Sequence, residues 1–249
     1  MRYALAYLRF EILRAVRNRR YMTLTMVVPA VLYLVLSRQT GPRVSVLGLP
    51  WAAYFAVSMI SFSAIGSALN AGGARLAMER SSGWTRQIRI TSLSASGFVG
   101  AKVLTALCVA LPGSLLVGLA GVLSGHVHLS VASWVQLYAS VWFAVLPFAA
   151  LGMVIGYAFD VDTAQIGTAV SMVVLSLLGG LFAPTSSFPQ ILQDLAKVTP
   201  TYEMANAGRA ALASSWPRPV DLAGLILWTA VLGAILAWLY RRDEASSAE

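Results

Sequence analysis

The stretch WAAYFAVSMISFSAIGSALNAGGARLAMERSSGWTRQIRITSL, residues 51–93, joins a long apolar run to a dense polar segment. Residues 51–70 contain no charged side chain, and about 20 apolar residues suffice for a helix to cross a bilayer. Residues 75–93 then contain four arginines and a glutamate. An apolar span that ends in a basic segment is typical of a membrane helix followed by a cytoplasmic loop.

The rest of the chain repeats this alternation. Of 249 residues, 58% are hydrophobic and only 11% are charged, whereas about a quarter are charged in an ordinary globular protein. We therefore predict an all-α integral membrane protein, a single domain over residues 1–249. Its six expected transmembrane helices cover residues 21–36, 51–70, 102–124, 133–159, 163–182 and 222–240.

The positive charges predict the orientation of the chain. If the N-terminus lies inside, thirteen of the eighteen lysines and arginines fall on cytoplasmic segments and five on outer segments. We expect a multi-pass protein of the plasma membrane with both termini cytoplasmic. The net charge of +8 is explained by this topology, so no nucleic-acid partner is expected.

The N-terminal arm, residues 1–20, is predicted to be an amphipathic helix at the membrane interface. Its apolar stripe consists of Leu5, Leu8, Ile12 and Val16. Glu11 lies away from that stripe, and the arginines expected to meet anionic headgroups are Arg9, Arg14 and Arg17. The arm either only fixes the orientation of the chain in the membrane, or it also contacts a cytoplasmic partner.

Residues 183–221 differ from the other connections. Five prolines divide them, and two short helical pieces fit near 189–198 and 201–213. Leu192 and Leu195 would share an apolar face of the first piece. We predict a broken helical segment at the outer surface before the last span, with an ordinary structured loop as the alternative.

Local patterns predict how the spans begin, bend and pack. Gly152 and Gly156 are four residues apart, a spacing that lets helices approach closely. Pro147 lies within a span and should kink it. In the short inner turn 160–162, Asp162 is predicted to be a helix N-cap, and Gln165 is predicted to be its capping-box partner.

Several kinds of chemistry are missing. Residues 103–159 contain no acidic or basic side chain except two histidines, which argues against a carrier driven by an ion gradient. No glycine-rich phosphate loop, metal-ligand spacing or nucleophile elbow occurs. We therefore expect no enzyme activity, catalytic residue, metal or bound cofactor on this chain.

The polar segment within residues 71–99 is predicted to be a cytoplasmic loop. Arg75 and Glu79 are spaced to pair on one helix face, and the Ser-Ser-Gly sequence should interrupt that helix. Trp84 beside Arg86 and Arg89 could anchor a short surface helix. A basic loop with an interfacial tryptophan explains these residues equally well.

The segment ERSSGWTRQIRITSLS, residues 79–94, resembles the first cytoplasmic loop of ABC-2 type transporter permeases. Residues 17–35 are similar to that family's entry into its first span, and residues 179–209 to its proline-broken segment. Ser92 departs from the pattern, where the family usually has proline. The positions that match in the loop are Glu79, Arg80, Gly83, Arg89, Thr91, Leu93 and Ser94.

The resemblance implies a permease subunit of an ATP-driven exporter, of the kind that moves drugs or antibiotics. A separate ABC ATPase would bind ATP and Mg²⁺, and a second permease chain would complete a homodimer or heterodimer. The loop would dock on the ATPase. The residues expected to form this coupling element are Arg75, Glu79, Arg80, Gly83, Trp84, Arg86 and Arg89.

The charge-free spans favour a hydrophobic or amphipathic small molecule as the substrate. The serines of the second span, Ser58, Ser61 and Ser63, are candidates for the pathway, although helix packing is the simpler role for them. An ATP-independent secondary carrier and a non-transporting membrane scaffold are the alternative functions.

Overall fold

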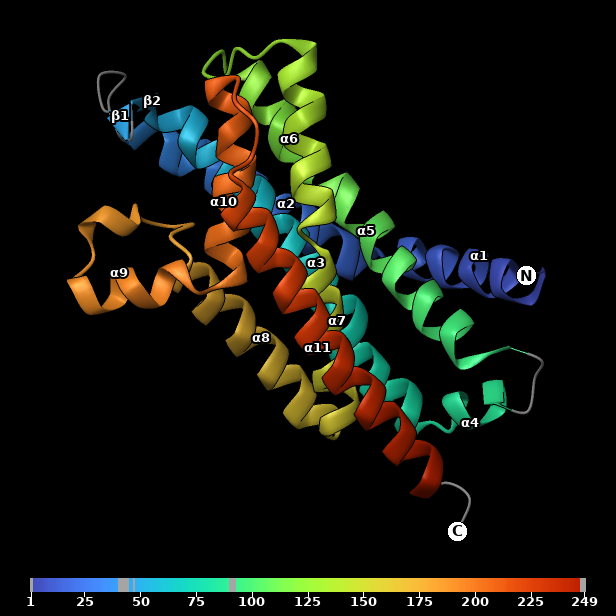
Figure 1. Cartoon of the computed structure of the whole chain (residues 1–249). Helices are drawn as coiled ribbons and strands as arrows, with labels where there is room; N and C mark the ends of the chain where they lie inside the picture. Colours follow the sequence, from blue (N-terminus) through green and yellow to red (C-terminus); the bar gives the residue numbers. More distant parts are fainter. Residues whose placement is uncertain (1, 40–44, 47, 90–92, 247–249) are drawn as a thin grey trace.

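In the computed structural model, which describes residues 2–39, 45–46, 48–89 and 93–246, long helices form a bundle around α3 (Trp51–Ser81) (Figure 1). Five helical stretches in this part of the chain are long and apolar enough to cross a membrane. A shorter apolar stretch, Thr25–Arg38, lies within α2 (Arg19–Gln39). The predicted all-α membrane fold is confirmed, with five long spans and one shorter one.

The helix α3 forms the centre of the bundle. It contacts α5 (Ala95–Leu123), α2, α7 (Leu146–Ala158) and α8 (Val161–Leu178), and its apolar window is buried throughout. It also extends eleven residues beyond the predicted span. The first part of the predicted loop 71–99 is therefore helical and continuous with α3, because residues 71–81 contain no proline and the Ser-Ser-Gly interruption comes only at the end of that stretch.

The helices α3 and α7 cross with their backbones in contact. A Cβ added at Gly156 would lie 2.6 Å from the carbonyl oxygen of Gly72, and one at Gly152 would lie 2.7 Å from that of Leu69. The close approach predicted for the glycine pair is therefore confirmed. Only glycine leaves room for the facing backbone here.

The predicted fourth span is divided in two. The helix α6 (Val131–Phe143) ends at Ala144, and α7 begins at Leu146 with Pro147 in its first turn. Proline lacks the N–H that would continue the helical hydrogen bonds, so the bend predicted at this residue is present.

The N-cap of α8 is Asp160, not Asp162 as predicted. The Asp160 carboxylate accepts a 2.8 Å hydrogen bond from the Thr163 backbone N–H, and its pKa is lowered by hydrogen bonds from Thr163. Asp162 lies in the first turn instead. The helix starts two residues earlier because Asp160 is already in the extended conformation that an N-cap requires.

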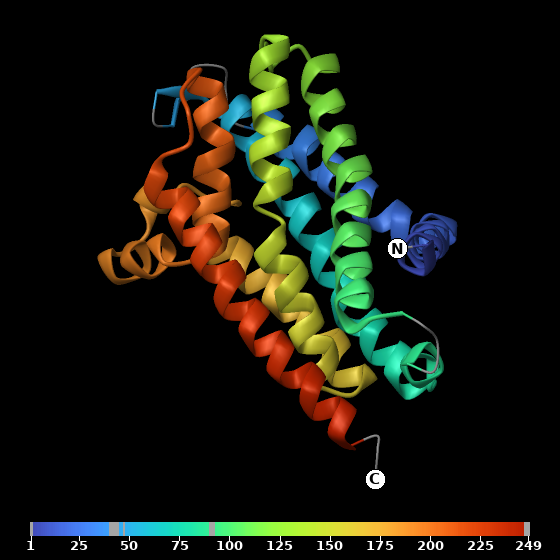
Figure 2. The same ribbon diagram turned by 45° about the vertical axis from the view of Figure 1, so that its right-hand side comes forward.

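The proline-rich segment forms two helices, as predicted. After a short 3₁₀ turn (Thr185–Ser187), α9 (Gln190–Lys197) projects from the bundle and α10 (Pro200–Ala210) runs back along it (Figures 1 and 2). Leu192 and Leu195 are exposed on α9, whereas most of α10 is buried against α3, α6 and α11. A 3₁₀ turn (Ala211–Ala213) leads to α11 (Pro219–Ser246), which runs the length of the bundle.

The two ends of the bundle carry different elements. One end holds α4 (Trp84–Arg89) and the C-terminal end of α11, and we call it the inner end because it is predicted to face the cytoplasm. The opposite end holds a two-residue hairpin of β1 (Ser45–Val46) and β2 (Leu49–Pro50). The N-terminal helix α1 (Arg2–Arg17) lies crosswise to the long helices in both views (Figures 1 and 2).

Candidate functional site

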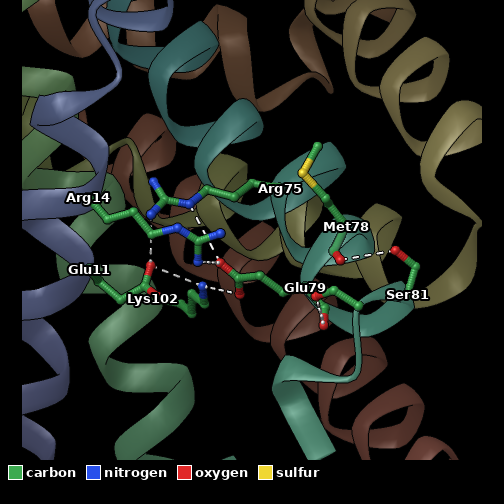
Figure 3. Close-up of polar contacts among 8 residues, drawn as sticks. Glu11, Arg14, Arg75, Met78, Glu79, Ser81 and Lys102 are labelled. Atoms are coloured by element: carbon green, nitrogen blue, oxygen red, sulfur yellow. Dashed lines mark hydrogen bonds and ion pairs between the residues drawn. The ribbon is translucent and has the colours of Figure 1, made fainter.

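A cluster of buried charges joins three helices near the inner end. Lys102 of α5 donates to both Glu11 of α1 and Glu79 of α3, with N–O distances of 3.1 and 2.5 Å (Figure 3). Arg14 of α1 binds Glu79 at 2.9 Å. Arg75 of α3 lies 3.3 Å from Glu11 and 3.6 Å from Glu79, which confirms the predicted pair four residues apart. We call these five residues the inner-end cluster.

Burial makes this cluster different from an ordinary surface network. The side chains of Glu11 and Glu79 are each 1% exposed and that of Lys102 is 2% exposed, whereas Arg14 is 40% exposed. Charges taken out of water are costly unless they are closely paired. Each carboxylate here has at least two cationic neighbours, so the cluster fixes α1, α3 and α5 relative to one another.

The sequence prediction for Glu11 was wrong. It was placed on the polar side of the arm, away from the apolar stripe, but Tyr7, Glu11 and Ala15 form the face of α1 that packs on the bundle. Leu5 and Val16 of the predicted stripe are exposed instead. The Glu11 side chain of α1 faces the bundle because Lys102 and Arg75 lie on that side. Helical periodicity does not reveal this tertiary pairing.

A compositional signal could have located the cluster. Residues 1–159 contain only two acidic residues, Glu11 and Glu79, and the structure brings both to Lys102, one of only two lysines in the chain. Scarce opposite charges in an apolar chain tend to pair, because an unpaired charge would be expensive. Neither Glu11 nor Lys102 was among the predicted site residues.

The helix α3 ends at a sharp turn that produces α4. Gly83 adopts a φ of +74°, which residues with a side chain rarely adopt, and an added Cβ would meet no atom within 4 Å. The predicted interruption at Ser-Ser-Gly is confirmed. Trp84 then packs against Phe10 of α1, with ring centroids 5.8 Å apart.

One face of α4 is packed and another is open. Thr85 and Ile88 are buried, whereas Gln87 is exposed, as are Ser81 and Ser82 just before the turn. Arg86 and Arg89 belong to α4, but their side chains lie outside the described structure, as do Thr91 and Ser92. Within the described part of the predicted coupling loop, Ser81, Ser82 and Gln87 form an open surface.

Arg80 links this turn to the far side of the bundle. Its guanidinium binds Asp243 of α11 at 2.7 Å, donates to the carbonyl oxygen of Gly156 at 3.0 Å and lies over the Tyr157 ring. The end of α3 is thereby tied to α7 and α11 as well as to α1 and α5. A displacement of α4 would be transmitted to all of these helices at once.

The remaining predicted residues have simpler positions. Arg9 and Arg17 are exposed on α1, where they could meet lipid headgroups. The three serines of α3 are buried within this single chain: Ser63 donates to the Thr25 carbonyl oxygen, and Ser58 to that of Tyr54. Ser58 also accepts from the buried Arg209 of α10. The hydrogen bonds of Ser58 and Ser63 fit packing roles, and the buried Ser61 hydroxyl has no hydrogen-bond partner among the described residues.

The fold and the inner-end cluster define a multi-pass, all-α membrane protein with a short helix presented at one end. Comparison with known proteins identifies its family. The ABC-2 type transporter family model matches residues 4–213, and the chain belongs to this family. It is also 26% identical over 235 residues to the Bacillus subtilis (strain 168) protein named "Putative transport permease YvfS", covering 94% of this chain and 96% of that one. The chain is a membrane transport permease.

Proposed function

We propose that this permease is the membrane subunit of an ATP-driven exporter that moves a hydrophobic or amphipathic small molecule out of the cell. ATP and Mg²⁺ bind to a separate ABC ATPase on the inner side. Two permease chains, identical or different, form the pathway, and both termini of each lie in the cytoplasm. The membership in the ABC-2 family supports the ATPase partner.

One structural observation carries the coupling part of this proposal. The open surface Ser81, Ser82 and Gln87 at the α3–α4 turn is attached through the inner-end cluster and Arg80 to four other helices. A push by the ATPase on α4 would therefore move α3 together with α1, α5, α7 and α11. Coupling two conformational states in this way requires an element that both sites bias, and the end of α3 is the element that we propose for this role.

Glu79 takes an indirect role in this mechanism. Its side chain is buried and directed toward α1 and α5, so it cannot form part of the docking surface. It holds the docking turn to the bundle, and Arg75 and Arg80 act in the same way. Direct contact with the ATPase is left to Ser82, Gln87 and the neighbouring part of α4.

The test is reconstitution with and without the ATPase. The permease is co-expressed with a candidate ABC ATPase, the complex is purified, and transport of fluorescent amphipathic compounds is followed in proteoliposomes. We expect transport that requires ATP, Mg²⁺ and the ATPase, and ATP hydrolysis that rises with substrate. An ATPase variant unable to hydrolyse ATP is the control.

The alternatives give different results in the same vesicles. A secondary carrier would move substrate without the ATPase when an ion gradient is imposed. A scaffold would bind its partner but show no transport under any condition. Either outcome would reject the exporter function while leaving the permease fold unchanged.

A further inference from the structure

A groove runs along the outside of the bundle at its inner end, between α5, α7 and α11. It encloses about 420 Å³, within the range of ligand-binding pockets, and its walls are mostly apolar. Small residues make it deep, since Ala95 lies at its α5 edge, Ala150 at its base and Gly233 on α11. A Cβ added at Gly233 would meet no atom within 4 Å, so the groove is open there.

The groove ends in positive charge. Arg241 lines it and is exposed, and no ion pair in the described part of the chain includes Arg241. Ala95 and Ser96, in the first turn of the 29-residue helix α5, also line the groove, and the positive end of the helix dipole there favours an anion. An apolar trough that leads to a cation matches a molecule with a hydrocarbon tail and an anionic head.

The neighbouring side chains indicate the depth of the groove in the membrane. Trp238 is 60% exposed, and the guanidinium of Arg242 lies 5.7 Å from the centre of its ring. Exposed tryptophans and adjacent arginines are typical of the boundary between hydrocarbon and headgroups. The Arg241 end of the groove is therefore at headgroup level, and the Gly233 part is within the hydrocarbon.

We propose that this groove binds an anionic phospholipid of the inner leaflet. One acyl chain lies between α5 and α11 along Val99, Ala150 and Gly233, and the phosphate meets Arg241 and the first turn of α5. Met153 and Leu236, which line the groove, also belong to the apolar cluster that contains Ile88 of α4. The lipid thus supports the inner end on which α4 rests. This inference does not depend on the exporter function.

The experiment measures lipid retention by the full-length permease. The protein is purified in mild detergent, incubated with phosphatidylglycerol or phosphatidylcholine, and analysed by native mass spectrometry. Gly233→Phe fills the groove, and Ala234→Phe places the same ring on the exposed neighbouring position of α11. Arg241→Gln removes the headgroup cation, and Arg242→Gln removes the adjacent charge that does not line the groove.

We expect the wild type to retain one phosphatidylglycerol in preference to phosphatidylcholine. Gly233→Phe should abolish that binding, and Arg241→Gln should weaken it about tenfold, which corresponds to about 1.4 kcal/mol. Ala234→Phe and Arg242→Gln should bind as the wild type does.

Equal binding by all variants would overturn the site. Loss only in Gly233→Phe, with equal binding of both lipids, would overturn its anionic specificity. Arg241→Gln changes an exposed side chain, so its result does not depend on folding.

Discussion

Lys102 is the residue on which the inner-end cluster depends. It is the one lysine that contacts both Glu11 and Glu79, and without it these buried carboxylates would face each other with only the two arginines as partners. Removing one partner from a buried ion pair typically costs about 3–5 kcal/mol. We therefore predict that Lys102→Met lowers the thermal unfolding temperature of the purified permease markedly, as measured by intrinsic fluorescence in detergent.

The second lysine provides the control for this prediction. Lys197 pairs with Asp194 on α9, but both side chains are more than half exposed, so Lys197→Met should change stability little. If Lys102→Met were as stable as the wild type, the cluster would not hold α1 to the bundle.

Gly83 determines the direction in which α4 leaves α3. Because its φ is +74°, a β-branched residue would be strained there by about 1–2 kcal/mol. We predict that Gly83→Val favours continuation of the helix and reduces substrate transport per ATP hydrolysed, while the permease still inserts in the membrane. Gly48 also has a positive φ but lies at the opposite end, so Gly48→Val is the matched control. Equal coupling ratios in the two variants would contradict this role.

At the scale of elements, the crossing of α3 and α7 leaves no room for a larger residue at Gly156. A methyl group at Gly156 would press on the backbone carbonyls of Gly72 and Gly73, which cannot rotate away. We predict that Gly156→Ala destabilises the permease by about 1–3 kcal/mol, the usual cost of overpacking. At Gly167 of α8 the nearest atom is a methyl carbon of Ile155 at 3.6 Å, so Gly167→Ala should be neutral or slightly stabilising. Thermal unfolding of Gly156→Ala and Gly167→Ala in the same detergent measures the difference in stability between the two variants.

Element boundaries also show what the sequence can and cannot predict. Apolar length and proline positions placed the spans, the break before Pro147 and the two helices within 183–221, because these depend on local chemistry. The inward turn of Glu11, in contrast, depends on its contacts with Arg75 of α3 and Lys102 of α5. These contacts join residues 64 and 91 positions apart, so helical periodicity carries no sign of them.

At the scale of the whole molecule, the proposed docking surface predicts a variant that loses its ATPase partner. Gln87 is exposed on α4, and Gln87→Trp would place a bulky ring on the proposed docking surface. We expect it to lower both ATPase binding and transport, measured by co-purification and by uptake into inverted vesicles. Gln190→Trp makes the same change on α9, which is predicted to lie outside, and should leave both unchanged. Normal co-purification of Gln87→Trp would exclude this face of α4 as the contact.

The inner-end cluster also bears on how the protein is made. The arm α1 is synthesised first, yet its buried face is completed only when Lys102, ninety-one residues later, has emerged beside Glu79. At about 5–20 residues per second the ribosome needs several seconds to reach that point. During this interval Glu11 must remain in water, so the arm waits at the membrane surface while two spans insert. We therefore expect α1 to dock on the bundle only after Lys102 has been synthesised, because this lysine binds both buried carboxylates.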